Sequence, residues 1–337
     1  MYHQHLPKIQ TALADVPDGL LLEEHHPVAD GKGGVRHTEA IPGGKGQKTS
    51  WEVFPGCTLV FQDFLAGQVS CQHGAERDLL EINYCRYGRV GWNMKDGSSI
   101  YLGPGDFSLH TRQLCAGSVM TFPVGHYEGL AIWLDLSKFD MALPDFLGGT
   151  GVTAQALAEK FCAGGTSATL TGNEKTEPIF GGFYGQPEPL QQAHFRLKVM
   201  ELLLHLSAVS LSPKREADKY QTEQVEIARS VHDYILQHME QRVTIQELSQ
   251  RYLINPTTLK AVFKAVYGDS LAAHMNEHRM EKAALLLTQT KDSIAQIAQA
   301  VGYESQSRFS VVFRETYEMS PLEYRKLHGK SRIDGNK

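Results

Sequence analysis

The chain has 337 residues with 33 Lys and Arg against 38 Asp and Glu, a formal net charge of −5, and its length allows two domains. No run approaches the ~18 consecutive apolar residues of a membrane helix, and Met1-Tyr-His-Gln-His5 lacks a charged-then-apolar secretory pattern. We therefore expect a cytoplasmic protein with no membrane partner. The five cysteines are an odd number without a C-x-x-C pair, so neither a disulfide framework nor a zinc knuckle is indicated.

Residues 1–50 show no regular strand or helix pattern, and we expect an N-terminal arm and an irregular segment. Within it, Gly43-Gly-Lys-Gly-Gln-Lys48 is rich in glycine and lysine but lacks the order of a phosphate-binding loop and any preceding strand. It indicates a flexible turn.

Residues 51–140 contain short runs of β-branched and aromatic residues between glycine-rich turns, which is typical of a barrel or a sandwich. The expected strands are Cys57–Phe61, Leu79–Tyr87, Arg89–Trp92, Ser99–Leu102, Ser118–Phe122 and Tyr127–Leu134. The run Tyr101-Leu-Gly-Pro-Gly-Asp106 resembles the turn before a strand in cupin barrels. That resemblance implies a cupin-like β-barrel over 51–140 that acts as a sensor domain.

A sensor needs a cavity in which a few polar groups converge within an apolar lining. In the strand over 80–87, Leu80, Ile82, Tyr84 and Arg86 share one face, and the residues between them share the other. The pattern does not decide which face points inward. Aromatic rings and a guanidinium suit a planar or anionic ligand, and His110 lies close to the Gly-Pro-Gly-Asp turn. The candidate ligand-binding residues are Trp51, Arg86, Trp92, Tyr101 and His110, and ordinary core or surface positions are the alternative.

The same segment gives no pattern of catalysis. Metal-dependent cupins resemble one another in an H-x-H motif with a downstream Glu and a further His, and here the only H-x-H is His3-Gln-His5. The isolated candidates are His73, Glu81, His110 and His126. We expect no metal site, no cofactor and no enzymatic activity; a metal-dependent cupin enzyme fused to another domain is the less favoured alternative.

Residues 141–210 are predicted to be an irregular segment followed by a helical region. Ala154–Phe161 is an apolar helical patch, and Gln191–Val209 predicts an amphipathic helix with apolar residues along one side. This helix either docks on its own barrel or forms a dimer contact. Residues 211–222 are polar, contain a proline and indicate a linker.

Two similar segments follow, over 223–328. Ile245, Leu248 and Ser249 recur 49 residues later as Ile294, Ile297 and Ala298, and Leu259, Phe263 and Tyr267 recur 50 residues later as Phe309, Phe313 and Tyr317. Each copy therefore predicts a short helix, a tight turn and a second helix with one buried stripe at i, i+4, i+8.

Helix-capping residues delimit these helices. Thr244 with Glu247, and Ser293 with Gln296, have the spacing of a capping box. Asn255-Pro256 and Ser320-Pro321 place a capping side chain before a proline at the first helical position. Gly268 lies where a left-handed residue ends a helix, and Gly302 falls in the second turn.

The doubled unit, the joining helix around Arg279, and the run from Ile294 through Gly302-Tyr303 to Ser320-Pro321-Leu-Glu-Tyr324-Arg325 resemble the AraC family of bacterial transcription regulators. The resemblance implies an all-α domain with two helix-turn-helix units, so the fold class expected for the chain is α+β and multidomain. Residues 329–337 are expected to be a disordered tail.

The resemblance also implies two recognition helices that enter successive major-groove segments, roughly 34 Å apart. Carried over position by position, the DNA-binding residues are Thr257, Thr258, Lys260, Ala261, Lys264, Gln306, Ser307, Arg308, Ser310, Val311 and Arg314. Ala261 and Val311 stand where many family members carry arginine, so they either contact thymine methyl groups or pack against neighbouring helix. Phosphate contacts are expected from Lys264, Arg314, Arg325 and Lys326.

The expected function is that of a sequence-specific transcription regulator, an activator controlled by a small-molecule effector bound in the barrel. Its partners would be operator DNA, RNA polymerase, the effector and a second copy in a homodimer. The form of the first unit together with Leu80–Cys85 and the turn at Asp106 resembles regulators of the pyochelin type, which implies a ferric siderophore as one candidate effector. A constitutive regulator with a ligand-free barrel is the alternative. Residues 220–337 carry a net charge of +1 and residues 1–219 carry −6, which favours DNA contact by the C-terminal part.

Overall fold

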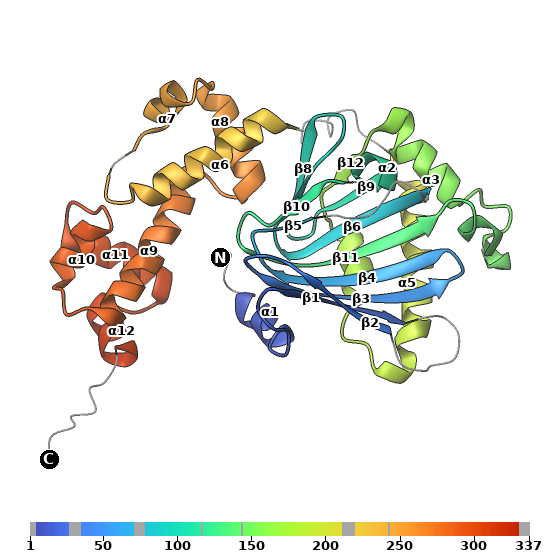
Figure 1. Cartoon of the computed structure of the whole chain (residues 1–337), viewed down its shortest axis with the longest axis horizontal. Coiled ribbons are helices and arrows are strands. Elements are labelled where there is room, and N and C mark those ends of the chain that lie inside the picture. The colour runs from blue at the N-terminus through green and yellow to red at the C-terminus, as the bar shows by residue number, and fades with distance from the viewer. Residues whose placement is uncertain are drawn as a thin grey trace, which may run out of the picture. The chain divides into compact units, whose positions relative to one another are not determined.

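The computed structural model describes residues 5–26, 35–70, 78–115, 117–142, 144–210, 220–241 and 243–329. The chain divides into two compact units, Met1–Thr222 and Glu223–Lys337, each described by itself below. Figure 1 labels their helices and strands. Most of the expected linker, 211–219, and most of the expected tail, 330–337, lie outside the described residues.

The first unit contains two β-sheets. The larger has the strand order β12-β9-β6-β11-β4-β3-β1-β2 and the smaller has the order β13-β8-β7-β10-β5. The larger sheet consists of β1 (Leu20–His26), β2 (Val35–Ala40), β3 (Lys45–Phe54), β4 (Cys57–Leu65), β6 (Leu79–Gly88), β9 (Phe107–Thr111), β11 (His126–Asp135) and β12 (Ala168–Leu170). The smaller consists of β5 (Gln68–Ser70), β7 (Val90–Asn93), β8 (Ser98–Leu102), β10 (Val119–Thr121) and β13 (Tyr220–Gln221). In the part of the chain that the structure describes, the strands do not close into a barrel, so the expected cupin-like barrel is not confirmed; the unit is a mixed α and β structure.

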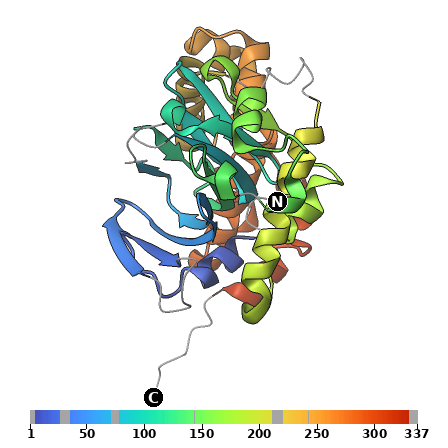
Figure 2. The ribbon, with the colours of Figure 1, turned by 90° about the vertical axis from the view of Figure 1, so that its right-hand side faces the viewer.

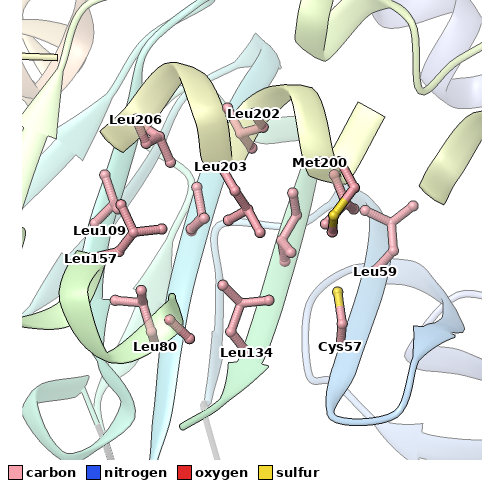
Figure 3. Packing of buried hydrophobic residues seen from close by; sticks show 14 of the residues in the cluster. Cys57, Leu59, Leu80, Leu109, Leu134, Leu157, Met200, Leu202, Leu203 and Leu206 are labelled. Carbon is pink, nitrogen blue, oxygen red and sulfur yellow. The ribbon is translucent and has the colours of Figure 1, made fainter. Parts of the chain in front are cut away.

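Helices cover one face of the larger sheet. They are α3 (Ala154–Phe161), α4 (Thr176–Gly181) and α5 (Glu188–Ala208), while α1 (Leu6–Ala12) and α2 (Arg112–Cys115) are short, as are the 3-10 helices Phe139–Ala142, Asp145–Leu147 and Ala163–Gly165. Figure 3 shows Leu202, Leu203 and Leu206 of α5 above the strands that carry Leu80, Leu109 and Leu134. Burying such a leucine contributes roughly 1.5–3 kcal/mol. This layer buries the apolar side of the helix that the sequence predicts over 191–209. In Figure 2, α5 is seen in yellow-green along one side of the blue and teal strands.

Strand β6 separates this helix-covered core from a second core. Leu80, Ile82 and Tyr84 pack under the helices, whereas Cys85 belongs to the core that includes Val90, Trp92 and Ile100 of the smaller sheet. The alternation of β6 thus decides the point that the sequence left open. The odd-numbered face, with Glu81 and Asn83, points between the two sheets.

The structure places regular elements within residues 1–50, for which the sequence predicts an arm and an irregular segment. Helix α1 buries Ile9 against Leu13 and Val16, and β1 runs parallel to β3 while pairing antiparallel with β2. All of β2 is exposed, and β1 mixes leucines with charged residues, so neither strand shows alternation of apolar and polar residues. Pairing with β3 rather than local pattern organises this segment.

Where the structure describes it, the second unit is built of helices. It consists of α6 (Thr222–Gln237), α7 (Ile245–Arg251), α8 (Pro256–Tyr267), α9 (Leu271–Gln289), α10 (Ile294–Ala300), α11 (Gln306–Tyr317) and α12 (Pro321–His328). Capping boxes begin α7 at Thr244 and α10 at Ser293, as expected, and a third one at Ser320 begins α12. The Asn255 side chain accepts from Thr257 N, and Gly268 ends α8 with φ of 86°. Both helix pairs therefore begin at the predicted capping boxes, and the first pair ends at the predicted Gly268, whereas α11 ends at Glu318 with φ of 57°.

The repeated stripes face the interior. Leu259, Phe263 and Tyr267 of α8 are buried, as are Phe309 and Phe313 of α11, whereas Tyr317 is half-buried. Helix α9 carries its own buried residues against the second pair, among them Met280, Ala283 and Leu287. The two helix pairs are thus attached to a shared central helix, which Figure 1 shows between them.

Arg279 of α9 joins the two pairs at one point. Its guanidinium donates from Nε to Met239 O at 2.9 Å and from Nη2 to Gln241 O at 2.9 Å, in the segment just after α6. The second turn passes close to the same place, since a Cβ at Gly302 would lie 2.4 Å from Met239 O and 2.7 Å from Arg279 Nη2. Gly302 has φ of 80°, so both its backbone angle and this contact require glycine.

Leu253 occupies the equivalent position of the first turn, 49 residues earlier, with φ of 53° and a side chain that is 94% exposed. A left-handed residue with a Cβ costs roughly 1–2 kcal/mol. The two turns have therefore the same backbone form, but in the first the leucine carries a strain that the second avoids.

Two substitutions test this difference through urea unfolding of the full chain, followed by circular dichroism. Gly302→Ala is expected to lower the free energy of unfolding by about 2 kcal/mol or more, because it combines left-handed strain with a collision at Met239 O. Leu253→Gly is expected to raise it by up to about 1 kcal/mol, since relief of strain exceeds the added freedom of the unfolded chain. Leu253→Ala removes the same exposed side chain without relieving φ and serves as control. A Leu253→Gly protein less stable than Leu253→Ala would contradict this account.

Candidate nucleic-acid interface and inter-sheet pocket

The outward face of α8 carries the residues expected to contact DNA. Thr257, Lys260, Ala261 and Lys264 are exposed and Thr258 is half-buried. They lie opposite the buried stripe, because the helix is fixed by its capping residue at Asn255 and by its apolar side. The face combines hydroxyls near the helix N-terminus with two ammonium groups farther along.

The outward face of α11 is built in the same way. Gln306, Ser307, Arg308, Val311 and Arg314 are exposed, and Ser310 is half-buried. Ser305 caps the helix by accepting from Arg308 N, which orients the first turn. The face offers an amide and a guanidinium, side chains that pair with adenine and guanine edges respectively.

The sequence leaves two alternatives open for Ala261 and Val311, namely contact with thymine methyl groups or packing against a neighbouring helix. Ala261 is exposed and Val311 is 56% exposed, so neither is buried against a neighbouring helix. Their apolar groups are available for contact with thymine methyls.

The central helix α9 sets the separation of the two faces. Its 19 residues correspond to a length of about 28 Å at 1.5 Å per residue. That length is comparable with the ~34 Å repeat of B-form DNA. A rigid α9, held by Arg279 at Met239 and Gln241, thus suits two contacts about one helical turn apart.

Arg325 has a different role from the phosphate contact expected of it. Its Nε donates to Leu287 O at 3.3 Å and its Nη2 donates to Asp292 O at 2.6 Å. These bonds tie α12 to the end of α9 and to the segment before α10, so the guanidinium serves the fold. Lys326 is exposed on the same helix.

In the first unit, a pocket of about 240 Å³ lies on the inter-sheet face of the larger sheet. It is lined by Glu23, Glu39, Lys48, Gln62, Ser70, Glu81, Asn83, Trp92, Arg112, Cys115, Met120 and Trp133. The lining includes buried polar atoms without a hydrogen-bond partner within the described residues: Gln62 Oε1, Asn83 Nδ2 and Arg112 Nη2. Such atoms are costly to bury unless a ligand or water satisfies them.

Glu81 is the carboxylate of this lining with which Arg112 and His110 interact. Arg112 Nε donates to its Oε1 at 2.6 Å, and His110 Nε2 lies 3.6 Å from its Oε2. Burial by itself raises the pKa of Glu81, but the neighbouring His110 and Arg112 outweigh burial and lower that pKa to about 2. The carboxylate therefore stays charged, and Arg112 retains a terminal nitrogen for another partner.

The five expected ligand-binding residues are not brought together. Trp92 lines the pocket, whereas His110 does not. The ring centroids of Trp92 and His110 are 6.1 Å apart. Trp51 stacks on His26 beside the helix-covered core, and Arg86 pairs with Glu128 and lies over Tyr184, on the opposite face of the sheet. Tyr101 is buried against Gly91 and does not line the pocket.

Sequence reasoning missed Gln62, Asn83 and Arg112. The signal that could have found Asn83 is its place in β6, where a polar side chain alternates with buried apolar ones. Gln62 comes close to Asn83 only through strand pairing. Arg112 reaches the pocket only because it lies on the short helix α2.

No helix in the described ranges has both the length and the hydrophobicity that a bilayer span requires.

Comparison with known proteins concerns the second unit. Residues 248–327 match the family model described as a helix-turn-helix domain. An uncharacterized HTH-type transcriptional regulator, YisR of Bacillus subtilis, is 31% identical over 127 residues, which are 38% of this chain and 42% of that protein. A putative AraC-like transcription regulator of Streptomyces lividans is 36% identical over 83 residues, 25% of this chain and 27% of that protein.

Among solved structures, the C-terminal domain of AraT, a response regulator from Geobacillus stearothermophilus, is 32% identical; the match covers 33% of this chain and 93% of that one, with a TM-score of 0.32. The chain spans less than half the length of the curated relatives described above. Residues 248–327 are therefore similar to a helix-turn-helix domain that is also present in an HTH-type and in a putative AraC-like transcription regulator.

Proposed function

We propose that this protein is a sequence-specific DNA-binding transcription regulator of the AraC type. The observation that carries the proposal is the pair of outward faces on α8 and α11, attached to one helix and held together by the Arg279 junction. Lys260, Lys264, Arg308 and Arg314 supply the positive charge on these faces, which suits contact with phosphates and base edges. In this proposal, the protein first binds its operator and then activates the promoter by contacting RNA polymerase.

Operator binding is tested by selecting sites for the full chain from random duplex DNA and measuring affinity on the selected site. Arg308→Ala is expected to lower affinity about 5- to 150-fold and to relax the preference at one base pair, because a bidentate pair with guanine is lost. Lys264→Ala is expected to weaken binding to all sequences and to reduce the salt slope by about 1. Lys138→Ala, an exposed lysine of the first unit, is the charge-matched control. Equal affinities for Arg308→Ala and Lys138→Ala would count against α11 as a recognition helix.

We also propose that the inter-sheet pocket binds a small polar effector. The unpartnered Gln62 Oε1, Asn83 Nδ2 and Arg112 Nη2 support a ligand that both donates and accepts hydrogen bonds. The volume of about 240 Å³ lies below the ~300–1,000 Å³ of typical ligand sites, which favours a ligand smaller than a ferric siderophore. A ligand that bound two arrangements of the protein unequally would shift the equilibrium between them.

The effector proposal is tested by a thermal-stability screen of small carboxylates, amino acids and sugars, with intrinsic fluorescence of Trp92 and Trp133 as the binding signal. Gln62→Leu is expected to weaken a compound that stabilises the wild-type chain by about 10-fold or more, since a buried donor on the ligand loses its acceptor. Gln155→Leu on the exposed side of α3 is the matched control. A compound that stabilises Gln62→Leu and Gln155→Leu equally does not bind at Gln62. Such a result would count against the pocket as the effector site.

A homodimer is proposed on the outer side of α5. While Phe195, Val199 and Leu203 of this helix are buried, Leu190 is 53% exposed, Leu197 68% and Leu204 43%. These three leucines are seven residues apart, a spacing that repeats along one side of a helix. A stripe of this kind is self-complementary about a twofold axis, so a second copy of the chain suits it. Helix α5 would then both dock on its sheet and form the dimer contact, the two alternatives that the sequence left open.

Leu197→Glu is expected to convert the dimer into a monomer in sedimentation-velocity runs, because a charge replaces the central apolar side chain of the stripe. Its far-ultraviolet spectrum should not change, as the residue is exposed. Leu327→Glu, at an equally exposed position on α12, is the control and should sediment like the wild-type chain. A wild-type chain that is already monomeric at micromolar concentration would refute the dimer.

A further inference from the structure

Three histidines of the second unit converge outside the DNA-contacting faces. His232 comes from α6, and His274 and His278 come from successive turns of α9. One ring nitrogen from each lies within 4.8 Å of the other two. The spacing of His274 and His278 is i, i+4, which puts both side chains on one side of the helix.

The distances are close to those of a metal site. His274 Nε2 and His278 Nε2 are 3.1 Å apart. Nitrogens bound tetrahedrally at 2.0–2.1 Å from a zinc ion are about 3.3 Å apart, so this pair already has the required separation. A ring nitrogen of His232 lies within 4.8 Å of both.

Neighbouring carboxylates orient two of the rings. His278 Nδ1 lies 3.1 Å from Glu281 Oε2, and His232 Nδ1 lies 3.4 Å from Asp233 Oδ1. A carboxylate only accepts, so each Nδ1 carries the proton and each Nε2 presents its lone pair. Carboxylates that hold metal-ligating histidines in this way are a regular feature of such sites. His274 would then carry its own proton on Nδ1 once Nε2 binds the ion.

Access also suits an ion. The side chain of His278 is 26% exposed and that of His232 is 15% exposed, while His274 lies at the base of the group.

The other group of potential ligands found in the described residues does not fit. Glu81, His110 and Cys115 also converge, but Arg112 donates to Glu81 at 2.6 Å and places a positive charge where an ion would lie. Around His232, His274 and His278, the ion pairs formed by the residues that the structure describes include those of His232 with Asp233 and of His278 with Glu281, both with carboxylates.

We propose that His232, His274 and His278 form a binding site for a divalent late transition metal such as Zn²⁺, with water completing a tetrahedral shell. Imidazole ligands suit zinc, cobalt, nickel and copper rather than magnesium or calcium. The ion joins α6 to α9. Because His232 stacks on Tyr267 of α8 with ring centroids 4.4 Å apart, the site also lies against the first of the two outward-facing helices.

The site is tested with the full-length, untagged chain after chelator treatment. Titration with Co²⁺ is expected to produce the visible absorption of tetrahedral cobalt, and Zn²⁺ should abolish it by displacement. His278→Gln is expected to lose that absorption together with about one metal equivalent. His328→Gln, which removes an exposed histidine of α12, is the control and should keep both. Equal absorption and stoichiometry in His278→Gln and the wild-type chain would overturn the proposal.

Thermal unfolding gives a second measurement that does not depend on one variant. In the full-length wild-type chain, excess Zn²⁺ is expected to raise the unfolding midpoint of the second unit by about 5 °C or more, because only the folded chain assembles the three ligands. His232→Asn should remove this rise. An unchanged wild-type midpoint in excess Zn²⁺ would equally overturn the site, whatever the variants do.

Discussion

The contact of Arg279 with the carbonyls of Met239 and Gln241 is the constraint on which the second unit depends. The guanidinium joins the segment after α6 to the central helix, and Gly302 lets the second turn lie against Met239 O. Two DNA contacts about one turn apart need such a fixed separation. The exposed side chains of α8 and α11 keep this separation only while Arg279 stays bonded to Met239 and Gln241.

What could be foreseen from the sequence in this unit was local. A capping box forms between residues three apart, as at Thr244 with Glu247, and a buried stripe repeats every four, so both leave a pattern in the chain. Arg325 could not be foreseen, because its partners Leu287 O and Asp292 O are 38 and 33 residues away. Nothing in its neighbourhood distinguishes an arginine that binds phosphate from one that binds carbonyls. The strained Leu253 was hidden for a similar reason, since only the backbone angle reveals it.

In the first unit, the strands β4, β6, β7, β8, β10 and β11 were predictable, whereas β1, β2, β3, β5 and the assembly of the sheets were not. Those expected between residues 57 and 134 begin within one residue of β4, β6, β7, β8, β10 and β11, because β-branched and aromatic runs mark them. Sheet order depends on pairings that sequence does not display. The pocket follows from that order, since Gln62 and Asn83 lie on strands either side of β11. Trp51 and Arg86 were misplaced because an alternating strand offers two faces, and the helices that choose between them come a hundred residues later.

Polar side chains gather at one place in each unit. In the first, Glu81 and Arg112 are buried and paired, and the remaining unsatisfied atoms of that wall favour a ligand. In the second, the histidine cluster lies beside the Arg279 junction, as His278 and Arg279 are consecutive on α9. Helix α6 supplies His232 at one place and leads to Met239 at the other, so the same two helices are joined twice. An ion at the histidines would restrict motion between α6 and α9, and the restriction would extend to α8 through Tyr267 and to the second turn through Met239 O. Metal binding and the spacing of the helices proposed to contact DNA would thus be linked through one helix–helix contact.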